Sequence, residues 1–112
     1  MIIAFTTKDI KWDSMMDPRF GRTEYILIYD DKKKVLKNYD NRAIENEAHG
    51  AGIKTAQKLS ELKPDILITG NGPGGNALSV LEKMNLKIYI GAGQMIVKDA
   101  YKAYCGGELQ KV

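Results

Sequence analysis

The residues best suited to bind a ligand lie in a glycine-rich segment that follows an apolar, β-branched run ending at Thr69. Five of the six residues from Gly70 to Gly75 are glycine or proline, and an apolar periodic segment comes next. This pattern predicts a buried parallel strand that enters a helix through a loop of nearly bare backbone. Such a loop lies at the carboxyl edge of a sheet, where its amides and the helix N-terminus suit an anionic group. The candidate binding residues of this segment are Gly70, Asn71, Gly72, Gly74, Gly75 and Asn76.

A single histidine and a single cysteine could act as metal ligands. His49 stands beside Gly50 where a helix is expected to begin, and this helix N-terminus could face the same sheet edge. The imidazole could ligate a soft metal or a cluster, or donate a hydrogen bond to an anion; the alternative is a capping or surface residue. Cys105 could supply a thiolate, although a small buried apolar role is the commoner one. One histidine and one cysteine cannot enclose a metal ion, but they could anchor a preformed cluster that brings its own inorganic ligands.

The glycine-rich segment matches neither of two known nucleotide-binding patterns well. The glycines at 70, 72 and 75 have the spacing of the dinucleotide fingerprint, but Pro73 interrupts it and the next predicted strand ends in Gly91 without a ribose-binding acid. A phosphate loop of the NTPase type would need Lys-Ser or Lys-Thr where Asn76 and Ala77 stand. The glycines alone could also simply make a tight turn.

Hydrolytic chemistry finds little support in the sequence. A two-metal nuclease needs several converging carboxylates, whereas the first predicted strand carries no acid. Asp9, Asp13 and Asp17 share one loop and could at most form a small oxygen-ligand site; caps and solubilising groups are their alternative role. We therefore expect a protein that is not an enzyme, with a nucleotide-binding or phosphodiester-hydrolysing enzyme as the less favoured alternative.

Length and composition fit one ordinary globular domain over residues 1–112. The chain is 44% hydrophobic and 28% charged, and its net charge of +3 is too small to indicate nucleic-acid binding. No apolar run is long enough to cross a bilayer, and the N-terminus lacks the basic start and cleavage site of a signal peptide. We expect a cytoplasmic protein with no membrane or nucleic-acid partner.

The expected elements alternate between strands and helices after an initial hairpin. Segment 6–23 has no sustained period and predicts a long ordered loop of the kind that often carries function. The helix at 48–62 has a small-residue face formed by Ala48, Gly52, Ala56 and Leu59, able to lie close to a sheet. The predicted strands are 2–5, 25–29, 35–39, 66–69 and 86–90, and the predicted helices are 48–62, 77–84 and 96–104.

Four segments of this chain resemble the dinitrogenase iron-molybdenum cofactor biosynthesis domain family. They are MMDPRFGRTEYILIYD at 15–30, HGAGIKTAQKL at 49–59, DILITGNGPGGNAL at 65–78 and IYIGAGQMIVKDAYKAYCGGEL at 88–109. The resemblance covers nearly the whole chain. It implies a ribonuclease H-like, three-layer α/β/α fold whose five-stranded mixed sheet has the order 3-2-1-4-5 with strand 2 antiparallel.

The resemblance also implies a function without catalysis. Nitrogenase-associated members bind the iron-molybdenum cofactor or its precursor and pass it on, which makes Arg19, Phe20, Gly21 and Arg22 candidate site residues beside His49. Nitrogenase-type members carry a histidine where this chain has Arg19. A guanidinium cannot ligate a metal but can pair with an anionic cluster or oxyanion; surface ion pairing is its alternative role.

Two hypotheses of different classes follow from these residues. The first is a carrier for an iron-sulfur or molybdenum-type metallocluster, or a related anionic metal species, with a cluster-delivering or cluster-receiving protein as its partner. Met15 and Met16 in loop 6–23 would offer weak thioether contacts to such a ligand. The second is a small interaction or regulatory module without a metal ligand, in which the glycine loops only build the fold.

Overall fold

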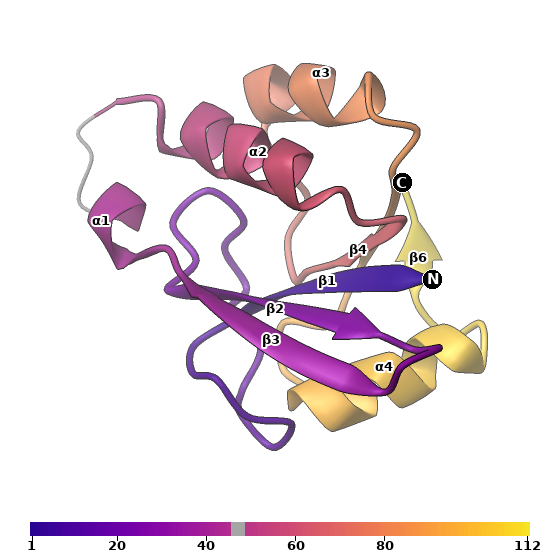
Figure 1. Cartoon of the computed structure of the whole chain (residues 1–112). Coiled ribbons are helices and arrows are strands. Elements are labelled where there is room, and N and C mark those ends of the chain that lie inside the picture. The colour runs from indigo at the N-terminus through magenta and orange to yellow at the C-terminus, as the bar shows by residue number, and fades with distance from the viewer. Residues whose placement is uncertain (46–48) are drawn as a thin grey trace.

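A mixed sheet of six strands lies between two helical layers in the computed structural model, which describes residues 1–45 and 49–112 (Figure 1). The order across the sheet is β3-β2-β1-β4-β5-β6. Strands β1, β4 and β5 are parallel neighbours, whereas β2 pairs antiparallel with both β1 and β3, and β6 pairs antiparallel with β5. The strands are β1 (Ile2–Thr7), β2 (Tyr25–Asp30), β3 (Val35–Asp40), β4 (Ile66–Ile68), β5 (Lys87–Ile90) and β6 (Gln110–Lys111).

The helices divide between the two faces of the sheet. Figure 1 shows α2 and α3 side by side on one face and α4 on the other. The helix α2 ends where Lys63 adopts a left-handed conformation and donates its N–H to Leu59 O, and Pro64 follows. The helices are α1 (Arg42–Glu45), α2 (Ala51–Leu62), α3 (Gly75–Glu82) and α4 (Val97–Cys105).

Alternation along the central strand separates two apolar cores. Ala4 of β1 packs with Leu67, Leu59 and Leu81 beneath α2 and α3, while Phe5 packs with residues on the α4 side. Because successive side chains of a strand point to opposite faces, a strand covered on both faces must be apolar throughout. This accounts for the continuous buried run of β1.

The expected three-layer architecture, the order 3-2-1-4-5 and the antiparallel second strand are confirmed, but the sheet has six strands rather than five. The added strand, β6, is two polar exposed residues long, so it carries no hydrophobic alternation that the sequence could show. The chain after β3 begins with the short helix α1, which is not among the helices predicted from the sequence. Ala48, expected in the first long helix, lies outside the described residues.

Two further expectations about α4 are wrong. Cys105 is exposed rather than buried. The sequence predicts that the helix buries Ile96, Ala100, Ala103 and Tyr104, whereas the residues buried in α4 are Val97, Ala100 and Ala103. Ile96 and Tyr104 are half-buried at the edges of this stripe, because the docking of the helix on the sheet turns Val97 into the core. Among the described residues, no helix is both long and apolar enough to cross a membrane.

Candidate anion-binding site

The carboxyl ends of the parallel strands meet at one edge of the sheet, where three loops cross. Asp17 N donates to Thr6 O at 2.8 Å, and Asn71 N donates to Pro18 O at 2.8 Å, so the long loop after β1 is fixed against the glycine-rich loop after β4. A Cβ on Gly70 would lie 2.5 Å from Pro18 Cα and 2.9 Å from Gly93 Cα. Gly70 is therefore a point of close backbone approach that allows the three loops to pack together.

A second close approach joins the loop after β1 to the first turn of α2. A Cβ on Gly21 would lie 2.8 Å from Gly52 Cα. Thr55 Oγ1 donates to Gly21 O at 2.7 Å, and Asn41 Nδ2 donates to Thr55 Oγ1 at 3.1 Å. Phe20 is buried in the core beside this contact. The Phe-Gly pair is thus held against α2 by packing and by a buried chain of hydrogen bonds.

These contacts form a hollow of about 460 Å³, which we call the rim hollow. It is lined by 19–22 from the loop after β1, by 49–52 at the start of α2, and by Gly72 and Gly74 from the loop after β4. His49 is exposed there. The structure therefore brings together three segments that are far apart in the sequence, including Arg19, His49 and the glycine-rich loop.

The N-termini of two helices border this hollow. Gly50 is the N-cap of α2 and Gly74 the N-cap of α3, and among the described residues neither helix has a side-chain cap or an acidic residue in its first turn. The first amides that donate within each helix are Lys54 N, to Gly50 O at 3.0 Å, and Leu78 N, to Gly74 O at 2.8 Å. The amides before them have no partner within the helix, so each N-terminus presents N–H donors and partial positive charge.

A smaller hollow of about 270 Å³ lies between the two helix starts and is lined by 50–53 and 74–77. It contains the predicted residues Gly75 and Asn76, and it shares residues 50–52 and Gly74 with the rim hollow. Gly70 and Asn71 line neither hollow: Gly70 is buried and Asn71 is tied by its amide to Pro18 O. Gly70 supports the loop from its buried side, and the Asn71 amide ties the loop to the segment after β1.

Arg19 is engaged by a buried carboxylate. Its Nε and Nη2 donate to the two oxygens of Asp17, each at 3.0 Å, and Asp17 also accepts the amides of Arg19 and Glu24. Asp17 is fully buried, whereas the side chain of Arg19 is 44% exposed. The guanidinium therefore reaches the rim hollow with its charge largely balanced, and Asp17 organises the loop.

The structure limits how a metal could be held. Within the described residues, no group of three or more His, Cys, Asp or Glu side chains could hold a metal ion. Since both carboxylate oxygens of Asp17 are already hydrogen-bonded, the small oxygen-ligand site considered for Asp9, Asp13 and Asp17 does not form. The donors gathered at the rim suit an anion that brings its own charge and ligands rather than a bare cation.

Sequence reasoning missed the residues that support the site. Thr55 and Asn41 are polar, buried and far apart in the sequence, and Asn41 Oδ1 has no hydrogen-bond partner among the described residues. The sequence predicts that Gly52 lies on the face of α2 that packs on the sheet, whereas its backbone lies against Gly21 at the rim hollow. The spacing Gly50-x-Gly52 beside the histidine is the signal that could have identified it.

Comparisons with known proteins agree with this architecture. A search of curated proteins finds no match. The chain is similar to the apo form of the orange protein from Desulfovibrio gigas, with 29% identity over 99% of this chain and 92% of that one, and a TM-score of 0.92. It is also similar to a DUF35-family protein from Thermotoga, with 31% identity over 98% and 91% of the two chains and a TM-score of 0.83. The family model described as dinitrogenase iron-molybdenum cofactor matches residues 1–107. The chain therefore belongs to the dinitrogenase iron-molybdenum cofactor family.

Proposed function

We propose that this protein is a non-catalytic carrier that holds an anionic metallocluster, of iron-sulfur or molybdenum type, or a related anionic metal species in the rim hollow. The family name supports a role connected with the iron-molybdenum cofactor. The structure of the orange protein is described as an apo form, which supports ligand binding by that relative. A cluster-delivering or cluster-receiving protein would be the physiological partner.

One observation carries this proposal: two helix N-termini, which have no side-chain cap among the described residues, border the same hollow as the exposed His49. Backbone amides at helix starts bind anions without a dedicated cationic side chain. The imidazole would add one metal ligand or one hydrogen-bond donor to a cluster that supplies its other ligands. Arg19 would contribute through its guanidinium edge, with Asp17 fixing its position.

Binding without catalysis fits the groups that line the rim hollow. Metal-assisted hydrolysis needs carboxylates free to bind metal ions, whereas Asp17 has both oxygens occupied by donors. Among the described residues that line the rim hollow, His49 is the one side chain that could act as a general acid or base. Binding and release are the chemistry that this arrangement supports best.

Anaerobic reconstitution with iron, sulfide and molybdate, followed by metal analysis and visible absorption, tests the proposal. Stoichiometric uptake by the wild type is expected, with reduced uptake in His49→Ala. No uptake under several reconstitution conditions would contradict it and favour the interaction module. A phosphodiester- or nucleotide-hydrolysing activity that requires Asp9 or Asp13 would instead indicate an enzyme.

Gly74→Asp gives a sharper test because it should change stability and binding in opposite directions. A Cβ on Gly74 meets no atom within 4 Å, and its backbone is extended, so a side chain fits at this N-cap. The carboxylate should cap α3 and raise stability by a few tenths of a kcal/mol. It should also repel an anion and lower cluster uptake roughly tenfold.

Gly74→Asn is the matched control, since it caps the same helix without adding a charge. It should raise stability similarly while retaining more uptake than Gly74→Asp. Equal uptake by the wild type and both variants would mean that the start of α3 takes no part in binding.

A further inference from the structure

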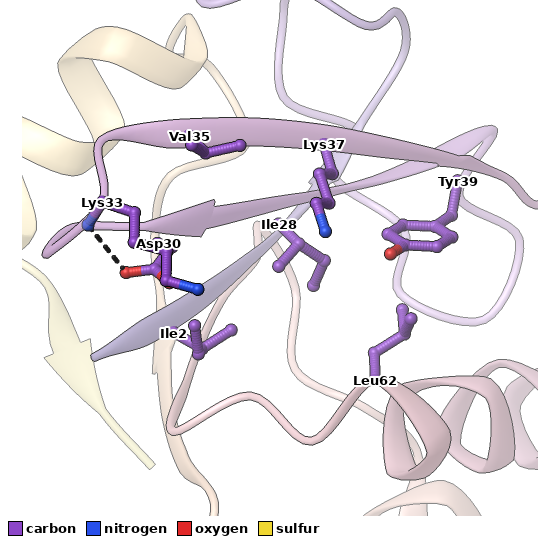
Figure 2. Close-up of a pocket in the computed structure, with 8 residues that line it drawn as sticks. All are labelled: Ile2, Ile28, Asp30, Lys33, Val35, Lys37, Tyr39 and Leu62. Carbon is purple, nitrogen blue, oxygen red and sulfur yellow. Dashed lines mark hydrogen bonds between the residues drawn. The ribbon is translucent and has the colours of Figure 1, made fainter.

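A second hollow, far from the rim, lies over the hairpin formed by β2 and β3. We call it the hairpin hollow; its volume is about 300 Å³. Figure 2 shows Ile2, Ile28, Tyr39 and Leu62 around it, contributed by β1, β2, β3 and the last residue of α2. It lies on the sheet face that carries α2 and α3, beside α2. Within the part of the chain that the structure describes, α2 is the last helix in this layer, and no helix covers the outer part of the face over β3.

The opposite face of the same hairpin packs its apolar residues against the α4 side of the protein. Tyr29 contacts Trp12 with ring centroids 4.8 Å apart and Tyr101 with centroids 5.4 Å apart, and Leu36 joins this core. On the open face, by contrast, Val35 is 41% exposed. Ile2, Tyr39 and Leu62 nearby are only half-buried, and a group of partly exposed apolar side chains of this kind is typical of a surface that another element covers.

The hairpin hollow also has a basic wall. Lys33 and Lys37 line it together with a single carboxylate, Asp30. Among the residues that the structure describes, neither lysine lies within ion-pair distance of a carboxylate. Asp30 Oδ1 accepts the amides of Lys32 and Lys33, at 3.0 and 3.1 Å.

The other carboxylates of the hairpin are also engaged by nearby donors. Asp31 pairs with the N-terminal ammonium at 2.8 Å, and Asp40 pairs with Arg42 at 2.7 Å. Positive charge therefore dominates the side of the hollow formed by β3.

We propose that the hairpin hollow docks an amphipathic helix of a partner protein, with apolar residues on one side and acidic residues along its edge. Its apolar side would fill the space above Ile28, Tyr39 and Leu62, and its carboxylates would face Lys33 and Lys37. An element in this position lies in the helical layer, next to α2, and extends the cover that α2 and α3 give the rest of the sheet. This inference does not depend on ligand binding at the rim.

A selection from displayed helical peptides tests this docking surface. Each peptide would have apolar residues fixed at i, i+3, i+4 and i+7, with Glu, Ser or Lys at the remaining positions. The wild type should enrich acidic peptides. Amide shifts on titration with an enriched peptide should centre on Ile28, Lys37 and Tyr39.

Charge reversal then identifies the contacts. The double variant Lys33→Glu, Lys37→Glu should weaken an enriched acidic peptide at least about tenfold and improve its lysine counterpart. Lys102→Glu is the matched control, because Lys102 is exposed on α4 on the other face of the sheet. It should leave the affinity for the acidic peptide unchanged.

Several results would overturn the docking proposal. These are the absence of enrichment, preference for basic peptides, shifts centred on another surface, or equal binding by the charge-reversed variant. Self-association measured by sedimentation, together with concentration-dependent amide shifts at Val35 and Lys37, would show that a second copy of the chain occupies the hollow instead.

Discussion

The rim hollow and the hairpin hollow lie at opposite ends of α2 and differ in the chemistry of their walls. The first residues of α2 line the rim hollow, which combines glycine backbone and helix N-termini with the side chains of Arg19, Arg22 and His49. Leu62, the last residue of α2, lines the hairpin hollow, whose walls are apolar and lysine side chains. Backbone amides offer the same donors to any anion, whereas side chains select a partner by shape and charge. One helix thus separates a surface suited to a small anion from one suited to a protein.

The largest effect is expected at the loop crossing that supports the rim. Gly70→Val would place a Cβ 2.5 Å from Pro18 Cα, a backbone atom that cannot move alone. The free energy of unfolding should fall by about 3 kcal/mol, measured by denaturant unfolding. Gly72→Ala is the control, because its Cβ would meet Ile90 Cγ2 at an ordinary 3.7 Å. Equal stability of the two variants would contradict a structural role for Gly70.

A smaller effect is expected from the hydrogen bonds beneath the rim. Thr55→Val should destabilise the protein by about 1–3 kcal/mol, because Gly21 O and Asn41 Nδ2 each lose a buried partner. Thr55→Ser keeps the hydroxyl and should recover most of this stability. If the two variants unfold at the same denaturant concentration, the hydroxyl does not hold Gly21 against α2. Neither variant should change peptide binding at the hairpin hollow.

The smallest effect concerns a carboxylate at the rim end of the hairpin. The hydrogen bond and charge of Arg42 lower the pKa of Asp40 from 3.8 to about 2. Because the pKa of Asp40 is lower in the folded state than in the unfolded state, its ion pair with Arg42 stabilises the folded protein above about pH 4. This contribution is lost as the pH falls toward 2. Carboxyl NMR titration should show the Asp40 pKa rising toward 3.8 in Arg42→Ala. An unchanged pKa would mean that the pair does not form in solution.

Much of the fold could be predicted because its signals are local. The hairpin, the glycine-rich turns and the strands on both sides of β1 follow from short windows of apolar pattern and turn residues. The strand order came from the resemblance. The polar strand β6 and the short helix α1 have no such pattern, and pairing with β5 is what makes β6 a strand. The exposure of Cys105 depends on how α4 is rotated about its axis against the sheet. The apolar pattern of the sequence fixes this rotation only to within about one residue, so it does not decide whether Cys105 is buried.

For the candidate site, the sequence by itself determined which segments have bare backbone and where the histidine and arginines stand. Only the tertiary structure decided that the starts of α2 and α3 border one hollow, that Gly70 supports the loops rather than lining that hollow, and that Asp17 balances Arg19. The physical reason is distance along the chain. Turn and helix propensities act over a few residues, whereas burial of a carboxylate and convergence of two helix N-termini depend on segments that only the packed sheet brings together.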